Sequence, residues 1–172
     1  MKIFLLGYMG SGKSTLAKAL STQKKLPFID LDHYIEQKEG QSVTEIFKKK
    51  GEIYFRKQEI TYLNELLNSE KSFVLALGGG TPCYGTNMQN ILKASKNVFY
   101  LKYQPQTLAE RLEFQKQNRP LIAHLGNEEL LDFVRKHLFD RNPYYSQATH
   151  IITMDNLSEK QALETILSLI SD

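Results

Sequence analysis

The chain has 172 residues, of which 41% are hydrophobic, and both values are typical of a single compact domain, which we expect to span residues 1–172. The 22 basic and 19 acidic residues leave a formal net charge of +3, which does not support a nucleic-acid-binding function. A lone cysteine, Cys83, excludes an internal disulfide, and no stretch approaches the roughly 18 apolar residues of a membrane span. We therefore expect a cytoplasmic protein with no membrane or nucleic-acid partner.

Short apolar runs alternate with longer amphipathic stretches, a pattern that predicts a parallel sheet covered by helices. The predicted strands are, in chain order, Lys2–Leu6, Pro27–Asp30, Phe73–Leu77, Asn97–Leu101 and His150–Thr153. Apolar spacing predicts helices over Lys13–Gln23 and Glu52–Leu67, and capping-box sequences predict helix starts at Ser42 and Ser158. The segment 115–126 has no clear period and contains Arg119-Pro120, so we predict a mobile surface segment there.

A phosphate-binding motif follows the first predicted strand. Gly7-Tyr-Met-Gly-Ser-Gly-Lys-Ser14 matches G-x-x-x-x-G-K-[ST] and stands directly before a predicted helix, as the motif requires. Its glycines let successive backbone amides point at phosphates, and the following helix places its positive end at the same position. Lys13 would supply charge to the β- and γ-phosphates, and the Ser14 hydroxyl suits a magnesium ion. The motif therefore predicts a nucleoside triphosphate and Mg²⁺ as ligands.

Proteins with this loop usually take a second carboxylate for magnesium from the end of a strand. The strand Phe73–Leu77 runs into Gly78-Gly79-Gly80 and offers no carboxylate, whereas Asp30 and Asp32 close the second predicted strand. If this segment is extended, both carboxylates lie on the same face, at the sheet edge where ligands bind. The alternative is that Asp32 only caps a helix that starts at His33.

Motifs along nearly the whole chain resemble those of the shikimate kinase family. They are Gly7–Thr15, Phe28–Asp32 with Ile35-Glu36, Gly40–Phe47, Gly51–Arg56 with Glu59, Leu77–Gly80, Arg119–Leu121, and Arg141–Tyr144 with Ala148. The resemblance implies a three-layer α/β fold of the P-loop kinase type, with a five-stranded parallel sheet in the order 2-3-1-4-5 flanked by helices. It also implies transfer of the γ-phosphoryl group of ATP to the 3-hydroxyl of shikimate, a step of chorismate and aromatic amino acid biosynthesis, in a monomer.

The resemblance implies a role for particular residues. The catalytic residues would be Lys13, Asp32 and Arg119. ATP would be bound by Gly10, Ser11, Gly12, Lys13, Ser14, Thr15 and Arg119, and shikimate by Asp32, Arg56, Gly79 and Arg141. Mg²⁺ would be held directly by Ser14 and through water by Asp30. A helical segment at about 32–60 would bind the substrate, and residues 115–126 would form a lid. No residue is assigned to the adenine base, because Met154–Leu157 matches no specific pattern.

Other interpretations stay open at this point. Glu52 and Glu59 lie at helical spacing from Arg56, so these residues would alternatively form exposed ion pairs on a helix, and Arg141 would only favour a helix end. A gluconate or nucleotide kinase would share the loop and the lid. A regulatory module that only senses ATP would lack the acceptor site, whereas this chain has a polar residue at every acceptor position.

Overall fold

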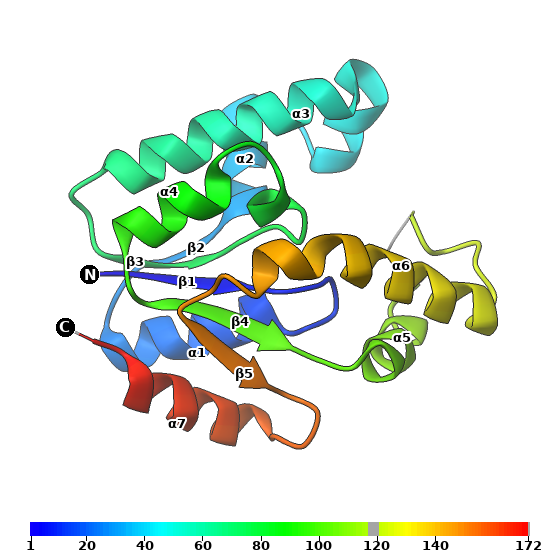
Figure 1. Ribbon diagram of the computed structural model, residues 1–172. Helices are drawn as coiled ribbons and strands as arrows, with labels where there is room; N and C mark the ends of the chain where they lie inside the picture. Colours follow the sequence, from blue (N-terminus) through cyan, green and yellow to red (C-terminus); the bar gives the residue numbers. More distant parts are fainter. Residues whose placement is uncertain (117–120, 172) are drawn as a thin grey trace.

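The computed structural model describes residues 1–116 and 121–171, and its centre is a five-stranded parallel sheet in the order β2-β3-β1-β4-β5 (Figure 1). The strands are β1 (Lys2–Leu6), β2 (Phe28–Asp30), β3 (Phe73–Ala76), β4 (Val98–Lys102) and β5 (His150–Thr153). Each predicted strand is present to within a residue or two at its ends. The predicted sheet order is confirmed.

Seven α-helices and one short 3₁₀ helix accompany the strands in the described part of the chain, and the last of them follows β5. They are α1 (Lys13–Lys24), α2 (Leu31–Glu39), α3 (Val43–Asn68), the 3₁₀ helix η1 (Thr81–Cys83), α4 (Asn87–Ala94), α5 (Pro105–Glu113), α6 (Asn127–Tyr145) and α7 (Glu159–Leu169). The capping boxes at Ser42 and Ser158 are both formed, with Glu45 and Gln161 as their partners. The predicted helix starts at these positions are therefore confirmed.

Two local predictions need correction. Asp30 and Asp32 do not share an extended segment, because α2 begins at Leu31. Asp32 is not the helix cap either: the Asp30 carboxylate accepts hydrogen bonds from the backbone amides of Asp32 and His33 and is itself the N-cap. The second predicted helix, Glu52–Leu67, is the longer part of α3, and the helical backbone breaks just before it at Gly51, where φ is 80°.

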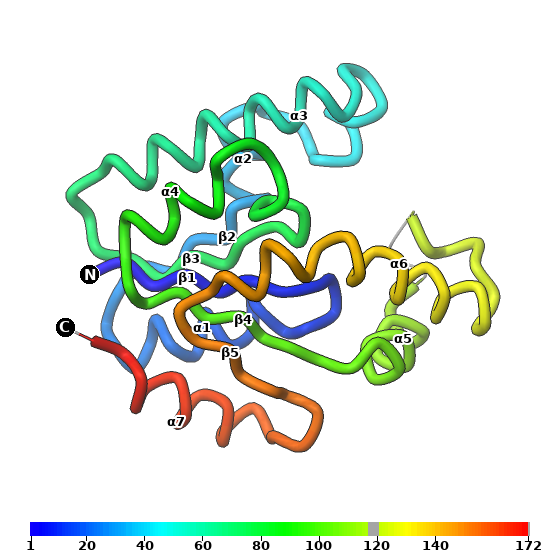
Figure 2. Tube along the Cα trace, in the orientation of Figure 1, coloured from blue at the N-terminus to red at the C-terminus, as the bar shows by residue number. Residues whose placement is uncertain are grey.

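The sheet forms the middle of three layers, as Figure 1 shows, with α1 and α7 on one face and α3, α4 and the C-terminal half of α6 on the other. Strand β1 is central and its residues Ile3–Leu6 are fully buried, which fits its continuous apolar sequence. The two termini lie near the N-terminal ends of the strands, and the loop after β1 lies at their C-terminal ends (Figure 2). No helix in the described residues is long and apolar enough to cross a membrane.

Candidate active site

The phosphate-binding motif forms a tight loop between β1 and α1. Gly10 and Gly12 have φ values of 78° and 83°, in the left-handed region that glycine adopts without strain. Gly12 caps α1 without a side-chain hydrogen bond, so backbone amides of the first turn are left to a ligand. The Lys13 ammonium donates to the backbone carbonyl of Tyr8 at 2.9 Å, which holds this charge beside the loop.

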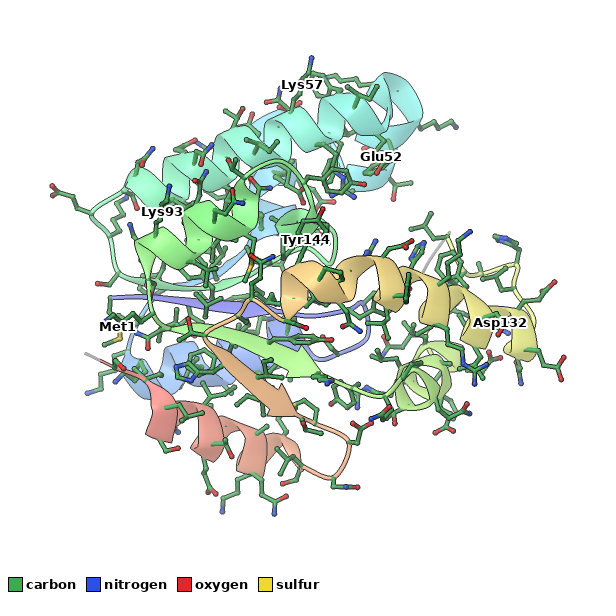
Figure 3. The ribbon with its side chains drawn as sticks, viewed as in Figure 1. Met1, Glu52, Lys57, Lys93, Asp132 and Tyr144 are labelled. Carbon is green, nitrogen blue, oxygen red and sulfur yellow. The ribbon has the colours of Figure 1, made fainter. Side chains whose placement is uncertain are left out.

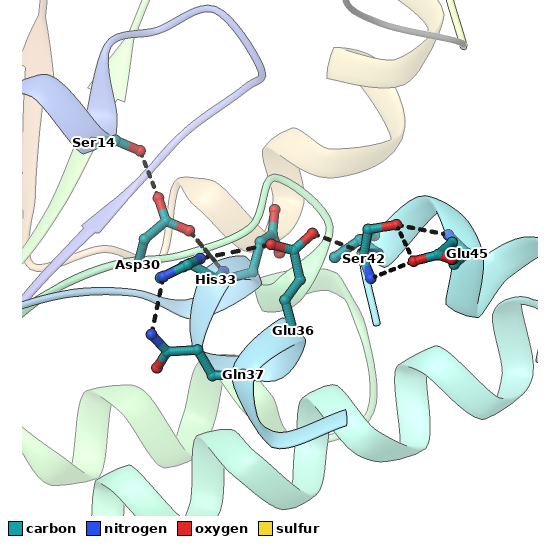
Figure 4. A network of polar contacts seen from close by, with 9 residues as sticks. Ser14, Asp30, His33, Glu36, Gln37, Ser42 and Glu45 are labelled. Carbon is teal, nitrogen blue, oxygen red and sulfur yellow. Dashed lines mark hydrogen bonds and ion pairs between the residues drawn. The ribbon is translucent and has the colours of Figure 1, made fainter. Parts of the chain in front are cut away.

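Ser14 and Asp30 meet at the start of α1. The Ser14 hydroxyl donates to Asp30 Oδ2 at 2.7 Å, while Asp30 Oδ1 caps α2. Figure 4 shows this contact and its continuation, in which the His33 ring lies 3.6 Å from Glu36 Oε2 and Glu36 Oε1 accepts from the amide of Val43. Two oxygens of the type that Mg²⁺ prefers are thus side by side at the phosphate-binding loop. The described residues contain no cluster of three or more His, Cys, Asp or Glu side chains that would hold another metal ion.

Asp32 is a half-buried carboxylate in the first turn of α2. Burial, with the charges of Asp30 and Glu59, raises the pKa of Asp32 to about 6, although Lys13 and Arg56 act in the opposite direction. A Cβ atom on Gly78 would lie 2.9 Å from Asp32 Oδ1, so the first glycine of the triple-glycine segment leaves room for this carboxylate. A carboxylate with a pKa near neutrality can accept a proton from a hydroxyl group.

Arg56 does pair with Glu52 and Glu59, the two glutamates at helical spacing from it, but the main pair is largely buried. Arg56 Nη1 lies 2.8 Å from Glu59 Oε2, and the side chains are 16% and 1% exposed. Glu52, labelled in Figure 3, is 55% exposed and lies 3.4 Å from Arg56 Nε. Glu59 also accepts from the Thr81 hydroxyl at 2.6 Å. The interpretation of Arg56 as part of an exposed ion pair is therefore wrong for Glu59, which holds the guanidinium in the interior.

Arg141 approaches the triple-glycine segment from α6. A Cβ atom on Gly79 would lie 3.3 Å from Arg141 Nη1. On the same helix, the Tyr145 hydroxyl donates to the backbone carbonyl of Gly79, which fixes α6 against this segment. Arg56 reaches the neighbouring glycine, because its Nη2 lies 2.7 Å from the position of a Cβ on Gly80. Two guanidinium groups therefore converge on one short backbone segment.

Two cavities meet at these residues. The first, about 320 Å³, is lined by Met9, Gly10, Gly12, Lys13, Ser14, Thr15, Asp30, Asp32, Leu77, Gly78, Gly79, Arg111 and Gln115. The second, about 400 Å³, is lined by Met9, Asp32, Val43, Thr44, Phe47, Phe55, Arg56, Glu59, Gly78, Gly79, Gly80, Leu121 and Arg141. The two share Met9, Asp32, Gly78 and Gly79. Of the predicted nucleotide residues, Gly10, Gly12, Lys13, Ser14 and Thr15 line the first cavity. The predicted acceptor residues line the second, and Asp32 lies at the junction.

Sequence reasoning missed Arg111 and a third, smaller cavity. Arg111 Nε donates to the carbonyl of Gly10 at 2.8 Å, and its guanidinium lies 5.0 Å from the Tyr103 ring centre. The cavity, about 140 Å³, is lined by Ser11, Gly12, Thr15, Leu16, Tyr103, Arg111, Met154, Leu157 and Glu159. No motif marks Arg111, whose role depends on how α5 packs beside the loop. Arg119, predicted as catalytic, lies outside the described residues.

Comparisons with known proteins agree with this geometry. The family model for shikimate kinase matches residues 9–171. A shikimate kinase from Flavobacterium psychrophilum is 46% identical over 169 residues, which cover 98% of each chain. The crystal structure of shikimate kinase from Bacteroides thetaiotaomicron has a TM-score of 0.88 and 39% identity, covering 98% of this chain and 94% of that one. A second structure, shikimate kinase from Acinetobacter baumannii in complex with shikimate, has a TM-score of 0.83 and 33% identity, covering 98% and 91%. The chain therefore belongs to the shikimate kinase family, and it is an ATP-dependent kinase.

Proposed function

We propose that this protein transfers the γ-phosphoryl group of ATP to the 3-hydroxyl of shikimate and releases ADP and 3-phosphoshikimate. The observation that carries the proposal is the junction of two cavities at Asp32 and Gly79, with the phosphate-binding loop in one cavity and Arg56 and Arg141 in the other. Phosphoryl transfer requires positive charge around the γ-phosphate and an acceptor hydroxyl held in line with it. This arrangement would supply both.

At the nucleotide end, Gly10–Thr15 would hold the phosphates of ATP through backbone amides, and Lys13 would stabilise charge on the transferring group. Mg²⁺ would be held directly by Ser14 Oγ and through water by Asp30, whose oxygens are 2.7 Å apart. When bound, the ion would neutralise phosphate charge. Arg119 would add a second positive charge from the proposed lid, residues 115–126. The small cavity beside Tyr103 and Arg111 would receive the adenine.

At the acceptor end, Arg56 and Arg141 would bind the carboxylate of shikimate. The planar guanidinium offers paired N–H donors that match a carboxylate, and both groups are already held at the triple-glycine segment. The backbone amide of Gly79 would donate to the same ligand. The cavity wall is formed in part by the helical segment at about 32–60, which contributes Val43, Thr44, Phe47 and Phe55.

Asp32 would orient the 3-hydroxyl of shikimate and accept its proton as the phosphoryl group transfers. Its position at the junction of the cavities supports this role, as does its raised pKa of about 6. The proton would move from the hydroxyl oxygen to an Asp32 carboxylate oxygen. The enzyme would act in the cytoplasm as a monomer, with small molecules as its only substrates.

The test is a coupled assay of ADP release with purified protein and MgATP, run separately with shikimate, gluconate and AMP. We expect ADP release that depends on shikimate and not on gluconate or AMP. Release that depends on gluconate or AMP and ignores shikimate would show that the acceptor is wrong. Release without any acceptor, unchanged by shikimate, would instead favour the ATP-sensing module.

A further inference from the structure

One residue of the phosphate-binding loop, Tyr8, contacts functional groups on both sides of the reaction. Its backbone carbonyl accepts from Lys13 Nζ at 2.9 Å and from the amide of Ser11 at 3.2 Å. Its side chain is 1% exposed, so the ring is held on all sides. The sequence motif allows any residue at this position, and the roles assigned so far do not use Tyr8.

The side chain of Tyr8 is directed at α6, the helix that carries Arg141. Tyr8 Oη and His137 Nδ1 share a hydrogen bond of 3.1 Å, and the two rings pack edge to face with their centres 6.2 Å apart. The Arg141 guanidinium carbon lies 5.4 Å from the centre of the Tyr8 ring. His137 and Arg141 lie on the same face of α6, one turn apart. Figure 1 shows the loop after β1 passing close to this helix.

Backbone atoms of the two residues that flank Tyr8, Gly7 and Met9, lie close to Gly79 in the wall of the acceptor cavity. A Cβ atom on Gly79 would lie 3.6 Å from Gly7 O, 3.6 Å from Met9 N and 3.3 Å from Arg141 Nη1. The loop, the triple-glycine segment and the guanidinium therefore meet in close contact. Because protein interiors are close-packed, a displacement of the loop by a fraction of an ångström must also displace its neighbours.

We propose that Tyr8 is a positioning residue for Arg141, through which a bound nucleotide strengthens the binding of shikimate. The inference rests on the proposed role of Arg141 as a ligand of the shikimate carboxylate. The Lys13 ammonium has three N–H donors and would share them between the Tyr8 carbonyl and phosphate oxygens, so nucleotide binding would change the geometry of its contact with Tyr8. The ring and hydroxyl of Tyr8 transmit this change to α6 and set the position of the Arg141 guanidinium.

The experiment measures the dissociation constant of shikimate by titration calorimetry, without nucleotide and with saturating MgADP. The ratio of the two constants is the coupling factor. In the parent protein we expect MgADP to strengthen shikimate binding about fivefold or more. The affinity for MgADP, measured with and without shikimate, must change by the same factor, because coupling between binding sites is reciprocal.

Tyr8→Phe removes the hydroxyl and keeps the ring, and it should lower the coupling factor by about twofold or more, towards a value of 1. His137→Leu breaks the same hydrogen bond from α6, where the residue is only half-buried, and should lower the factor similarly. This second variant carries the test if Tyr8→Phe proves unstable. The matched control is Tyr100→Phe, because Tyr100 is also buried and its hydroxyl donates to Asn142, next to Arg141, but it lies on β4 and not on the loop. Tyr100→Phe should keep the coupling factor of the parent.

The proposal is overturned if the parent shows no coupling, if the Tyr8 and His137 variants keep its coupling factor, or if Tyr100→Phe lowers the factor as much as they do. Arg141→Gln separates this inference from the proposed function. If Arg141→Gln weakens shikimate binding while Tyr8→Phe leaves the coupling unchanged, the inference fails and the assigned role of Arg141 stands. If Arg141→Gln leaves shikimate binding unchanged, both are wrong.

Discussion

The carboxylate of Glu59, which is almost fully buried, lies 2.8 Å from the Arg56 guanidinium and holds it in place. Both oxygens of Glu59 are used, because Oε1 accepts from Thr81 while Oε2 accepts from Arg56. Since Thr81 begins η1, directly after the triple-glycine segment, this network ties α3 to that segment. Arg56 is therefore held in place before any acceptor binds.

This network predicts very different effects for the two glutamates that contact Arg56. Glu59→Gln should destabilise the protein by about 1.5–3 kcal/mol, because the buried partner of Arg56 loses its charge and the guanidinium keeps only the exposed Glu52 as an ionic partner. Glu52→Gln is the matched control on the same helix, and it should change stability by less than about 1 kcal/mol because that pair is exposed. Chemical denaturation of both variants measures the difference. Equal effects would show that burial does not distinguish the two pairs.

Arg56→Gln and Arg141→Gln should each lower kcat/KM for shikimate by roughly 10- to 150-fold, since each would lose a charge-assisted hydrogen bond of about 1.5–3 kcal/mol. The loss should appear mainly in KM if the carboxylate is held equally in the ground and transition states. ATP affinity measured without shikimate should barely change. A substrate analogue that lacks the carboxylate provides the control: if it loses as much in the variants as shikimate does, neither arginine binds the carboxylate.

Asp32→Asn should lower kcat by about 10²–10⁴ if this residue accepts the proton, because the amide keeps the shape of the side chain but has no basic oxygen. In the parent, kcat/KM should rise with pH through a pKa near 6, as the carboxylate ionises. The variant should lack this rise. Steady-state kinetics across the pH range checks both statements, and a loss below threefold with an unchanged pH profile would remove the proton-accepting role.

The same variant should be more stable than the parent near pH 7.5. The pKa of Asp32 is raised from 3.8 to about 6 in the folded protein, so between these values the folded state binds more protons than the unfolded chain. The free energy of unfolding therefore falls as pH rises through this window, by up to about 3 kcal/mol. The amide side chain of the Asp32→Asn variant does not titrate, so its free energy of unfolding does not fall in this way. Thermal unfolding at about pH 4 and pH 7.5 tests the prediction, which fails if the parent and the variant show the same pH dependence.

Lys13→Met should lower kcat by about 10²–10³, because it removes positive charge from the site of the transferring phosphate and not from a packed core. The melting temperature of the nucleotide-free protein should change little. Lys18→Met is the matched control, since Lys18 is an exposed lysine on the same helix and lines neither of the two main cavities. Near-normal kcat in a folded Lys13 variant would refute the assigned role.

The sequence by itself determined the parts of this protein that depend on neighbouring residues. The phosphate-binding loop, the five strands and the two capping boxes are each specified within a short segment, because backbone geometry and local hydrogen bonds require particular residues there. The order of the strands came from the resemblance to a family, since periodicity alone does not say which strands are neighbours. The same resemblance pointed to Arg56, Gly79 and Arg141, which line one cavity in the structure.

Only the tertiary structure decided which partners these residues have. Helical spacing placed Glu52 and Glu59 equally near Arg56, and burial, which depends on how α3 packs against η1, made Glu59 the dominant partner. Asp30 was identified as a cap only when the first turn of α2 could be seen to begin at Leu31. Arg111 and the Tyr8–His137 contact carry no local signal, because they join residues 101 and 129 positions apart. Contacts over such separations result from the packing of whole elements, to which many residues contribute and which no short segment encodes.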